Sequence, residues 1–107
     1  MNGTRLLIEA AIGSGNRKAR DLAVSELCYK DAVSALEYVA KNSEYLDTRM
    51  SVVRYLYLME ALAALRRIMK SAKHGDARGY AKRMLEGREF EEDSESTYVG
   101  SDDDIWG

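Results

Sequence analysis

Ten basic residues offer the clearest chemistry in this sequence, because they fall in two groups that could hold phosphate or carboxylate groups. Arg is more frequent than Lys, and Arg contacts a phosphate through two parallel hydrogen bonds. The residues are Arg66, Arg67, Lys70, Lys73, Arg78, Lys82 and Arg83, joined by Arg17, Lys18 and Arg20. We expect them to bind nucleic acid or another polyanion. The alternative is that they only complement helix dipoles and stay solvated.

The opposite charge gathers in the last residues of the sequence. Residues 1–85 hold 15 Lys/Arg and 9 Asp/Glu, whereas residues 86–107 hold Arg88 alone and 9 Asp/Glu. The formal charge of −2 for the whole chain therefore combines a part at +6 with a part at −8. Such an acidic segment has too few apolar groups to fold by itself. We expect a disordered acidic tail over residues 87–107, which folds back on the basic body, docks on a partner or only aids solubility.

The tail contains a short acidic run with a hydrophobic tip, Asp102-Asp103-Asp104-Ile105-Trp106. Such a peptide can fill a small apolar pocket rimmed by Lys or Arg. Asp102 to Ile105 resembles the acidic C-terminal peptide of bacterial single-stranded-DNA-binding proteins, which recruits replication and repair partners. Trp106-Gly107 stands where that family has proline and phenylalanine, and that family is a β-barrel. The resemblance therefore implies only a mode of action, a partner-docking tail.

Arg67 and His74 are the candidates for catalysis. Their spacing at the end of a helix resembles the Arg-x(4–6)-His signature of HEPN-type ribonucleases, which implies attack at an RNA phosphate. The polar residue usual after that Arg is Ile68 here. Six intervening residues also turn the two side chains to different sides of a helix, unless the helix ends early. We expect a non-enzymatic protein, with the ribonuclease as an alternative.

Other kinds of site find little support in the sequence. Cys28 and His74 are the only cysteine and histidine, so one chain cannot assemble a Cys/His zinc site and we expect no metal or cofactor. Cys28 is predicted to be an inert thiol. The apolar runs are much shorter than the roughly 20 residues of a membrane-spanning helix. The N-terminal apolar stretch is too short and too charged for a signal peptide, so we expect a cytoplasmic protein.

The elements that must position these residues are all predicted to be helices. Neither glycine nor proline occurs between residues 17 and 73, which favours two long helices, Arg17–Lys41 and Asp47–Lys73, paired as an antiparallel hairpin. Two shorter helices, Thr4–Ile12 and Asp76–Glu86, are expected to cover this hairpin. Asn16 and Asp76 are predicted N-caps.

Apolar residues at helical spacing predict which sides are buried. In the first long helix these are Leu22, Tyr29, Ala32, Val33, Leu36, Val39 and Ala40, and in the second they are Tyr55, Leu58, Leu62, Leu65, Met69 and Ala72. A further apolar row consists of Val52, Leu56, Met59 and Ala63. This row is expected to be covered by the short helices or by self-association.

The sequence thus predicts an all-α protein, a small helical bundle over residues 1–86 with a disordered acidic tail over residues 87–107. The functional prediction is an accessory or adaptor protein whose basic body contacts nucleic acid or an acidic partner surface, modulated by the tail. The first alternative is a protein-interaction or oligomerisation module. The second is the HEPN-like ribonuclease.

Overall fold

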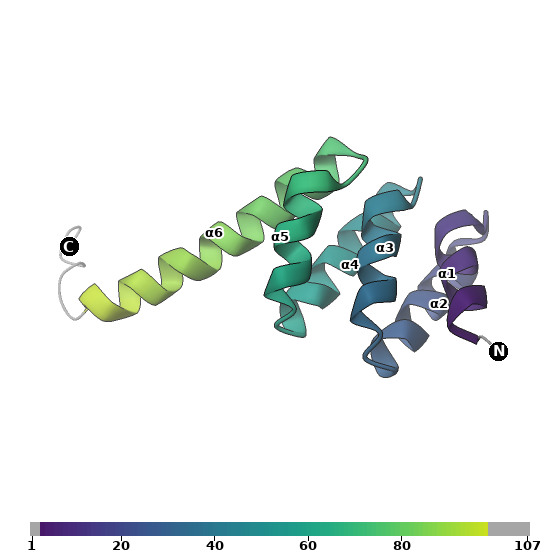
Figure 1. Cartoon of the computed structure of the whole chain (residues 1–107), viewed down its shortest axis with the longest axis horizontal. Coiled ribbons are helices and arrows are strands. Elements are labelled where there is room, and N and C mark those ends of the chain that lie inside the picture. The colour runs from purple at the N-terminus through teal and green to yellow at the C-terminus, as the bar shows by residue number, and fades with distance from the viewer. Residues whose placement is uncertain (1–2, 99–107) are drawn as a thin grey trace.

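The computed structural model describes the backbone of residues 3–98 and the side chains of residues 3–88. All regular structure in this range is helical, as predicted. The helices are α1 Gly3–Gly13, α2 Arg17–Tyr29, α3 Val33–Asn42, α4 Leu46–Leu58, α5 Leu62–Ser71 and α6 Gly75–Tyr98. They pair in chain order into three hairpins, α1–α2, α3–α4 and α5–α6, which stack side by side along an elongated body (Figure 1).

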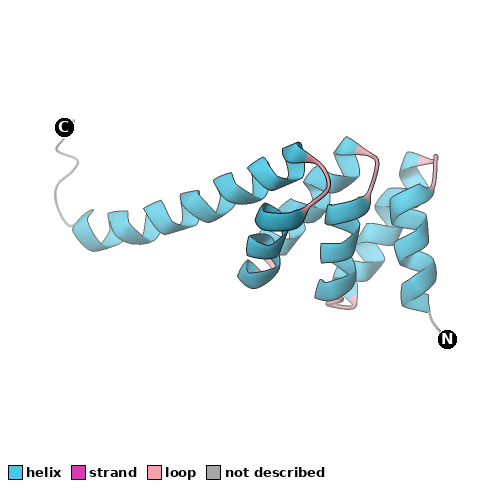
Figure 2. Ribbon diagram, turned by 45° about the horizontal axis from the view of Figure 1, so that its top comes forward, coloured by secondary structure: helices cyan, strands magenta, loops and turns pink. Residues whose placement is uncertain are grey.

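The stacked hairpins form two layers of helices. α1, α3 and α5 lie next to one another in one layer, and α2, α4 and α6 form the other (Figure 1). The turns within the hairpins lie along one edge, and the turns between hairpins lie along the opposite edge (Figure 2). Each hairpin therefore meets only its neighbours, which is the arrangement of a helical-repeat array.

The two long helices predicted from the sequence are each broken near the middle. Asp31 and Glu60 have φ of 55° and 64°, the left-handed conformation that commonly ends a helix. The amide of Ala32 donates to Leu27 O at 3.0 Å, and the amide of Ala61 donates to Leu56 O at 2.9 Å. The prediction was wrong because it required glycine at such a break, whereas Asp and Glu occupy these two positions.

The breaks also change which residues form the core. Leu22, Tyr29 and Leu58, predicted to be buried, are 68%, 87% and 66% exposed. A turn restarts the helical period, so one continuous apolar row cannot stay on the inside of two helices. The fully buried large side chains are Leu27, Leu36, Val39, Val52, Val53, Leu56, Leu65 and Ile68. Val52 and Leu56 of the further apolar row are covered within the chain, whereas Ala63 of that row is exposed.

A period of 29 residues relates the three hairpins. Leu27, Leu56 and Leu85 follow one another at this interval, and all three are buried. The left-handed residues Asp31 and Glu60 are also 29 apart. Each hairpin thus repeats the same supersecondary unit and buries its faces against the next.

The ends of the helices agree in part with expectation. The Asn16 side chain accepts from the Ala19 amide at 3.1 Å, which confirms it as the N-cap of α2. Asp76 lies within the first turn of α6 rather than before it. α6 continues to Tyr98, so residues 87–98 are helical where we expected disorder. Within the described residues, no helix combines the length and apolar character that crossing a membrane requires.

Candidate binding site at the end of the helical array

One arginine recurs at the same place in every hairpin. Arg20, Arg49 and Arg78 follow one another at intervals of 29 residues, each in the first turns of α2, α4 or α6. Each donates from Nη1 to the carbonyl oxygen six residues earlier, Ser14 O at 2.9 Å, Ser43 O at 2.9 Å and Ala72 O at 2.7 Å. The guanidinium therefore ties the turn within each hairpin to the helix that follows it.

The first two arginines also join neighbouring hairpins. Arg20 donates from Nη2 to both oxygens of Asp47 at 3.4 Å, and its Nε donates to Thr48 Oγ1 at 3.1 Å. Arg49 makes a bidentate contact with Asp76, at 2.9 Å and 2.7 Å. Hydrogen bonding from Arg49 holds the pKa of Asp76 below its usual value. In both cases the carboxylate comes from the first turn of a helix in the next hairpin.

Arg78 has no such carboxylate among the described residues. Arg20 and Arg49 are each 5% exposed, whereas Arg78 is exposed. Its hydrogen bonds to described residues go to the carbonyl oxygens of Ala72 and Lys73, and Nη1 donates both. The Nε and Nη2 edge, which binds a side chain in the first two hairpins, therefore makes no hydrogen bond with a described residue here.

The open end of the array carries a groove between α5 and α6. The groove has a volume of about 360 Å³ and is lined by Arg66, Met69, Lys82, Leu85 and Glu86. Lys70 lies one turn after Arg66 on α5, and Arg78 lies one turn before Lys82 on α6, so both share this side. We call the surface formed by Arg66, Met69, Lys70, Arg78, Lys82 and Leu85 the end face.

The end face occupies the position at which one hairpin meets the next. Glu37, Ala40 and Val53 in the second hairpin are 8%, 0% and 0% exposed. The residues 29 positions later are Arg66, Met69 and Lys82. An acidic residue and a valine are thus replaced by two cations, which keeps this side polar while Met69 and Leu85 provide an apolar floor.

Some cations of the end face have no opposite charge close by. Within the described part of the chain, Arg66 and Lys70 are exposed and form no ion pair. Lys82 lies 3.9 Å from Glu86 on the same helix, with both side chains 61% exposed. An exposed pair of this kind is weak. The face is therefore positively charged and open to an acidic ligand.

The other predicted basic residues lie elsewhere. Arg17 forms an ion pair with Asp47 at 3.1 Å, and Lys18 is exposed beside it on α2, in the first hairpin. Lys73 turns back toward the second hairpin and binds Glu44 at 2.8 Å. Arg83 lies over the Tyr80 ring at 5.6 Å. The ten residues therefore do not form one surface, since Arg20 is buried and the rest are spread along the array.

Arg67 and His74 do not share a site with each other. Arg67 makes three contacts of 2.9–3.1 Å with the Glu37 carboxylate, whose pKa is lowered chiefly by this bonding. His74 Nε2 lies 3.7 Å from Glu44 and has no hydrogen-bond partner among the described residues. Each candidate catalytic residue thus faces a different carboxylate.

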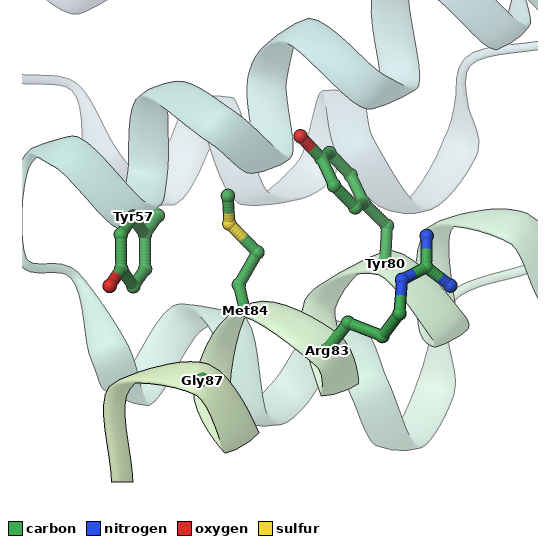
Figure 3. A pocket seen from close by; sticks show the side chains of 5 residues that line it. All are labelled: Tyr57, Tyr80, Arg83, Met84 and Gly87. Carbon is green, nitrogen blue, oxygen red and sulfur yellow. The ribbon is translucent and has the colours of Figure 1, made fainter. Parts of the chain in front are cut away.

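A second hollow lies between α4 and α6. Tyr57, Tyr80, Arg83, Met84 and Gly87 line a space of about 270 Å³. Met84 lies between the two tyrosines (Figure 3), and a Cβ added at Gly87 would meet nothing within 4 Å. The lining is aromatic and apolar with one cation at the edge, which suits a hydrophobic side chain rather than a reacting group.

Neither metal nor thiol chemistry finds a site in the described residues. No group of three His, Cys, Asp or Glu side chains there could hold a metal ion. Partial burial, with a smaller contribution from Asp31, raises the pKa of the Cys28 thiol, and a raised pKa lowers thiolate reactivity. The predicted docking residues 102–106 lie outside the described part of the chain.

The arginine series was missed by sequence reasoning, although the sequence carries a signal for it. Asp-x-Arg occurs at residues 47–49 and again at 76–78, and Lys18-Ala19-Arg20 stands at the same interval before them. A search for internal repeats would have found this period. Comparison with known proteins adds no further constraint, since no family model matches the chain and no solved structure is significantly similar to it.

Proposed function

We propose that the protein is a non-enzymatic adaptor that binds an acidic partner protein through the end face. The observation that carries this proposal is the pair of unpartnered cations, Arg66 and Lys70, beside the apolar floor of Met69 and Leu85. Charge attracts an acidic surface, and the apolar floor supplies the contact area that charge alone does not. The first and second hairpins of this array also bury their faces by stacking against a neighbour.

Neutralising two cations of the end face tests this function. Arg66→Ser with Lys70→Ser should weaken binding of a polyglutamate probe and lower its salt dependence, because two fewer cations meet the ligand. Lys18→Ser with Lys30→Ser removes the same charge from exposed positions of the first hairpin and is the matched control. Equal affinity of both double variants for the probe would refute the proposal.

Nucleic acid is the second candidate ligand, favoured by the same cations. Phosphate contacts by Arg66 and Lys70 would contribute a slope of about −2 to the dependence of affinity on salt. Duplex DNA and single-stranded RNA, titrated at several salt concentrations, distinguish this candidate from the first. Nucleic acid would be favoured if the protein bound DNA or RNA more tightly than polyglutamate and if Arg66→Ser with Lys70→Ser abolished that binding.

The acidic tail is proposed to act on a partner or on another copy rather than on its own Arg78. From Arg78 to Tyr98 the axis of α6 is about 30 Å long at ~1.5 Å per residue. Asp104 is six residues beyond Tyr98, a reach of at most roughly 20 Å. The aspartates of one chain therefore fall short of its own Arg78, and the tip Ile105-Trp106 is left for docking elsewhere.

The alternatives have less support. For a ribonuclease, Arg67 would have to leave Glu37 and approach His74. Cleavage of RNA that is abolished by His74→Ala would nevertheless establish that activity. For an oligomerisation module based on α4, Val52, Val53 and Leu56 are not available, because they are fully buried within the chain. The exposed large apolar side chains of that helix are Leu46, Tyr55 and Leu58.

A further inference from the structure

The repeated arginine geometry leads to a specific inference about the ligand of the end face. In the first two hairpins the same guanidinium edge binds a residue 27 positions later, Asp47 for Arg20 and Asp76 for Arg49. Both aspartates sit in the first turn of a helix. Arg78 keeps the same bond to the turn behind it, while its Nε and Nη2 make no hydrogen bond with a described residue.

We propose that Arg78 receives an aspartate from the first turn of an acidic helix in a partner protein, and that this helix lies across the end face. The inference deepens the proposed function and rests on it. Arg78 and Lys82 follow one side of α6, and Leu85 continues that side toward the groove. A helix seated on Arg78 at its N-terminus would therefore run over the groove, with its acidic side toward Lys82 and Arg66.

A second copy of this chain is a poor occupant of the end face. If copies stacked end to end, the residue equivalent to Asp47 and Asp76 in the first hairpin would meet Arg78. That residue is Lys18. Two cations would then approach each other, which opposes such stacking. The charge pattern thus selects an acidic helix from elsewhere.

The shape of the interaction follows from the two examples within the chain. Arg49 donates two parallel hydrogen bonds to Asp76, from Nε and from Nη2. Lys has no planar fork and cannot reproduce this contact. Arg78→Lys should therefore lose most of the affinity that Arg78 provides, although it keeps the charge. This result distinguishes recognition of a carboxylate from non-specific electrostatic attraction.

The test uses the full chain and a synthetic probe, an N-acetylated amphipathic peptide of about four turns. It carries Asp in its first turn, Glu along one side and Leu along the other. Arg78→Ala should weaken binding by about tenfold or more, and Arg78→Lys by nearly as much. Arg54→Ala, which removes an exposed arginine from α4, should change affinity less than twofold. Because Arg78 is exposed, circular dichroism should show that all three variants stay folded.

Exchanging the probe's Asp for Asn completes a double-mutant cycle. Wild-type chain should lose affinity for the Asn peptide, whereas Arg78→Ala should bind both peptides equally. Equal effects of the exchange on both chains would overturn the inference. Binding that requires Arg66 and Lys70 but not Arg78 would also overturn it while leaving the proposed function intact.

Two further outcomes would assign the end face to another occupant. Light scattering that shows a dimer dissociated by Arg78→Ala would identify a second copy and refute the inference. Arg78-dependent binding of duplex DNA, with no binding of the peptide, would identify a nucleic acid and would also refute it. Absence of binding to peptide, polyglutamate and DNA alike would remove the proposed function itself.

Discussion

At the scale of single residues, two non-glycine residues have a backbone conformation that glycine normally takes. Asp31 and Glu60 both adopt positive φ where α2 and α4 end. An L-residue pays about 1–2 kcal/mol for this conformation, and Asp tolerates it better than Glu because its short side chain can bond locally. Glu60 is therefore the more strained of the two.

Glu60→Gly should stabilise the fold. Relief of the left-handed conformation exceeds the added entropy of glycine in the unfolded chain by roughly 0.5–1 kcal/mol. The substitution also removes the exposed ion pair of Glu60 with Arg88 at 2.8 Å, which contributes little. Glu60→Gln removes the same pair and keeps the strain, so it is the control. A urea midpoint for Glu60→Gly at or below that of Glu60→Gln would contradict this explanation.

A second prediction at this scale concerns the acid sensitivity of Glu37. Arg67, and secondarily Lys41, holds the pKa of this carboxyl below its usual value. The unfolded chain then takes up the proton first as pH falls, so protonation favours unfolding. The stability contributed by Glu37 is complete above its unfolded pKa of about 4.3 and is lost as pH falls through the lower folded value.

Urea unfolding between neutral and acidic pH measures this effect. Glu37→Gln should flatten the decline of stability in the acidic range, because it removes the titrating group. Glu9→Gln is the control, since Glu9 is 63% exposed and pairs with Arg5 at 3.6 Å. If both variants decline as steeply as the parent, Glu37 is not a source of the acid sensitivity.

At the scale of elements, the arginine series joins each even-numbered helix to the next. Arg49→Ala would leave the Ser43 carbonyl and the Asp76 carboxylate without their donor. Loss of a largely buried ionic contact costs about 2 kcal/mol here, because Asp76 is 39% exposed and water compensates in part. Arg78→Ala should cost much less, since its only described bonds are to backbone carbonyl oxygens.

Chemical denaturation of the two variants checks this contrast. A similar loss for Arg49→Ala and Arg78→Ala would mean that the shared bond to the preceding turn, and not the carboxylate, provides the stability. Arg49→Lys helps to separate the two, because it keeps a charge near Asp76 but loses the bidentate contact.

The elements also show what the sequence could and could not predict. Apolar spacing and the Asn16 cap were sufficient for the helical class and for the start of α2. The breaks at Asp31 and Glu60 could not be predicted from composition, because their left-handed conformation is stabilised by bonds such as Ala32 N to Leu27 O. The basic character of the end face was predicted, whereas the role of Arg78 depends on the 29-residue period and on where neighbouring hairpins place their aspartates.

At the scale of the whole molecule, the length of α6 limits how closely the aspartates at positions 102–104 could approach their own Arg78. Because Tyr98 lies roughly 30 Å from Arg78 along the helix, the tail of one chain cannot neutralise that arginine. Removal of residues 99–107 should therefore leave the affinity of the end face for an acidic peptide within about twofold, apart from screened long-range repulsion. A much larger gain would mean that the tail competes for its own end face.

Trp106 allows the position of the tail to be followed directly, because it is the only tryptophan. Trp106 is eight residues beyond Tyr98, so its reach of roughly 27 Å includes the hollow at Gly87, which lies about 16 Å back along α6. If the tip is kept for a partner, the emission of dilute protein should be that of a solvated indole and should barely shift in urea. Gly87→Leu, which fills the hollow, should then have no effect. A blue-shifted emission that is independent of concentration and lost in Gly87→Leu would instead place the tip on its own chain, and a shift that grows with concentration would place it on a second copy.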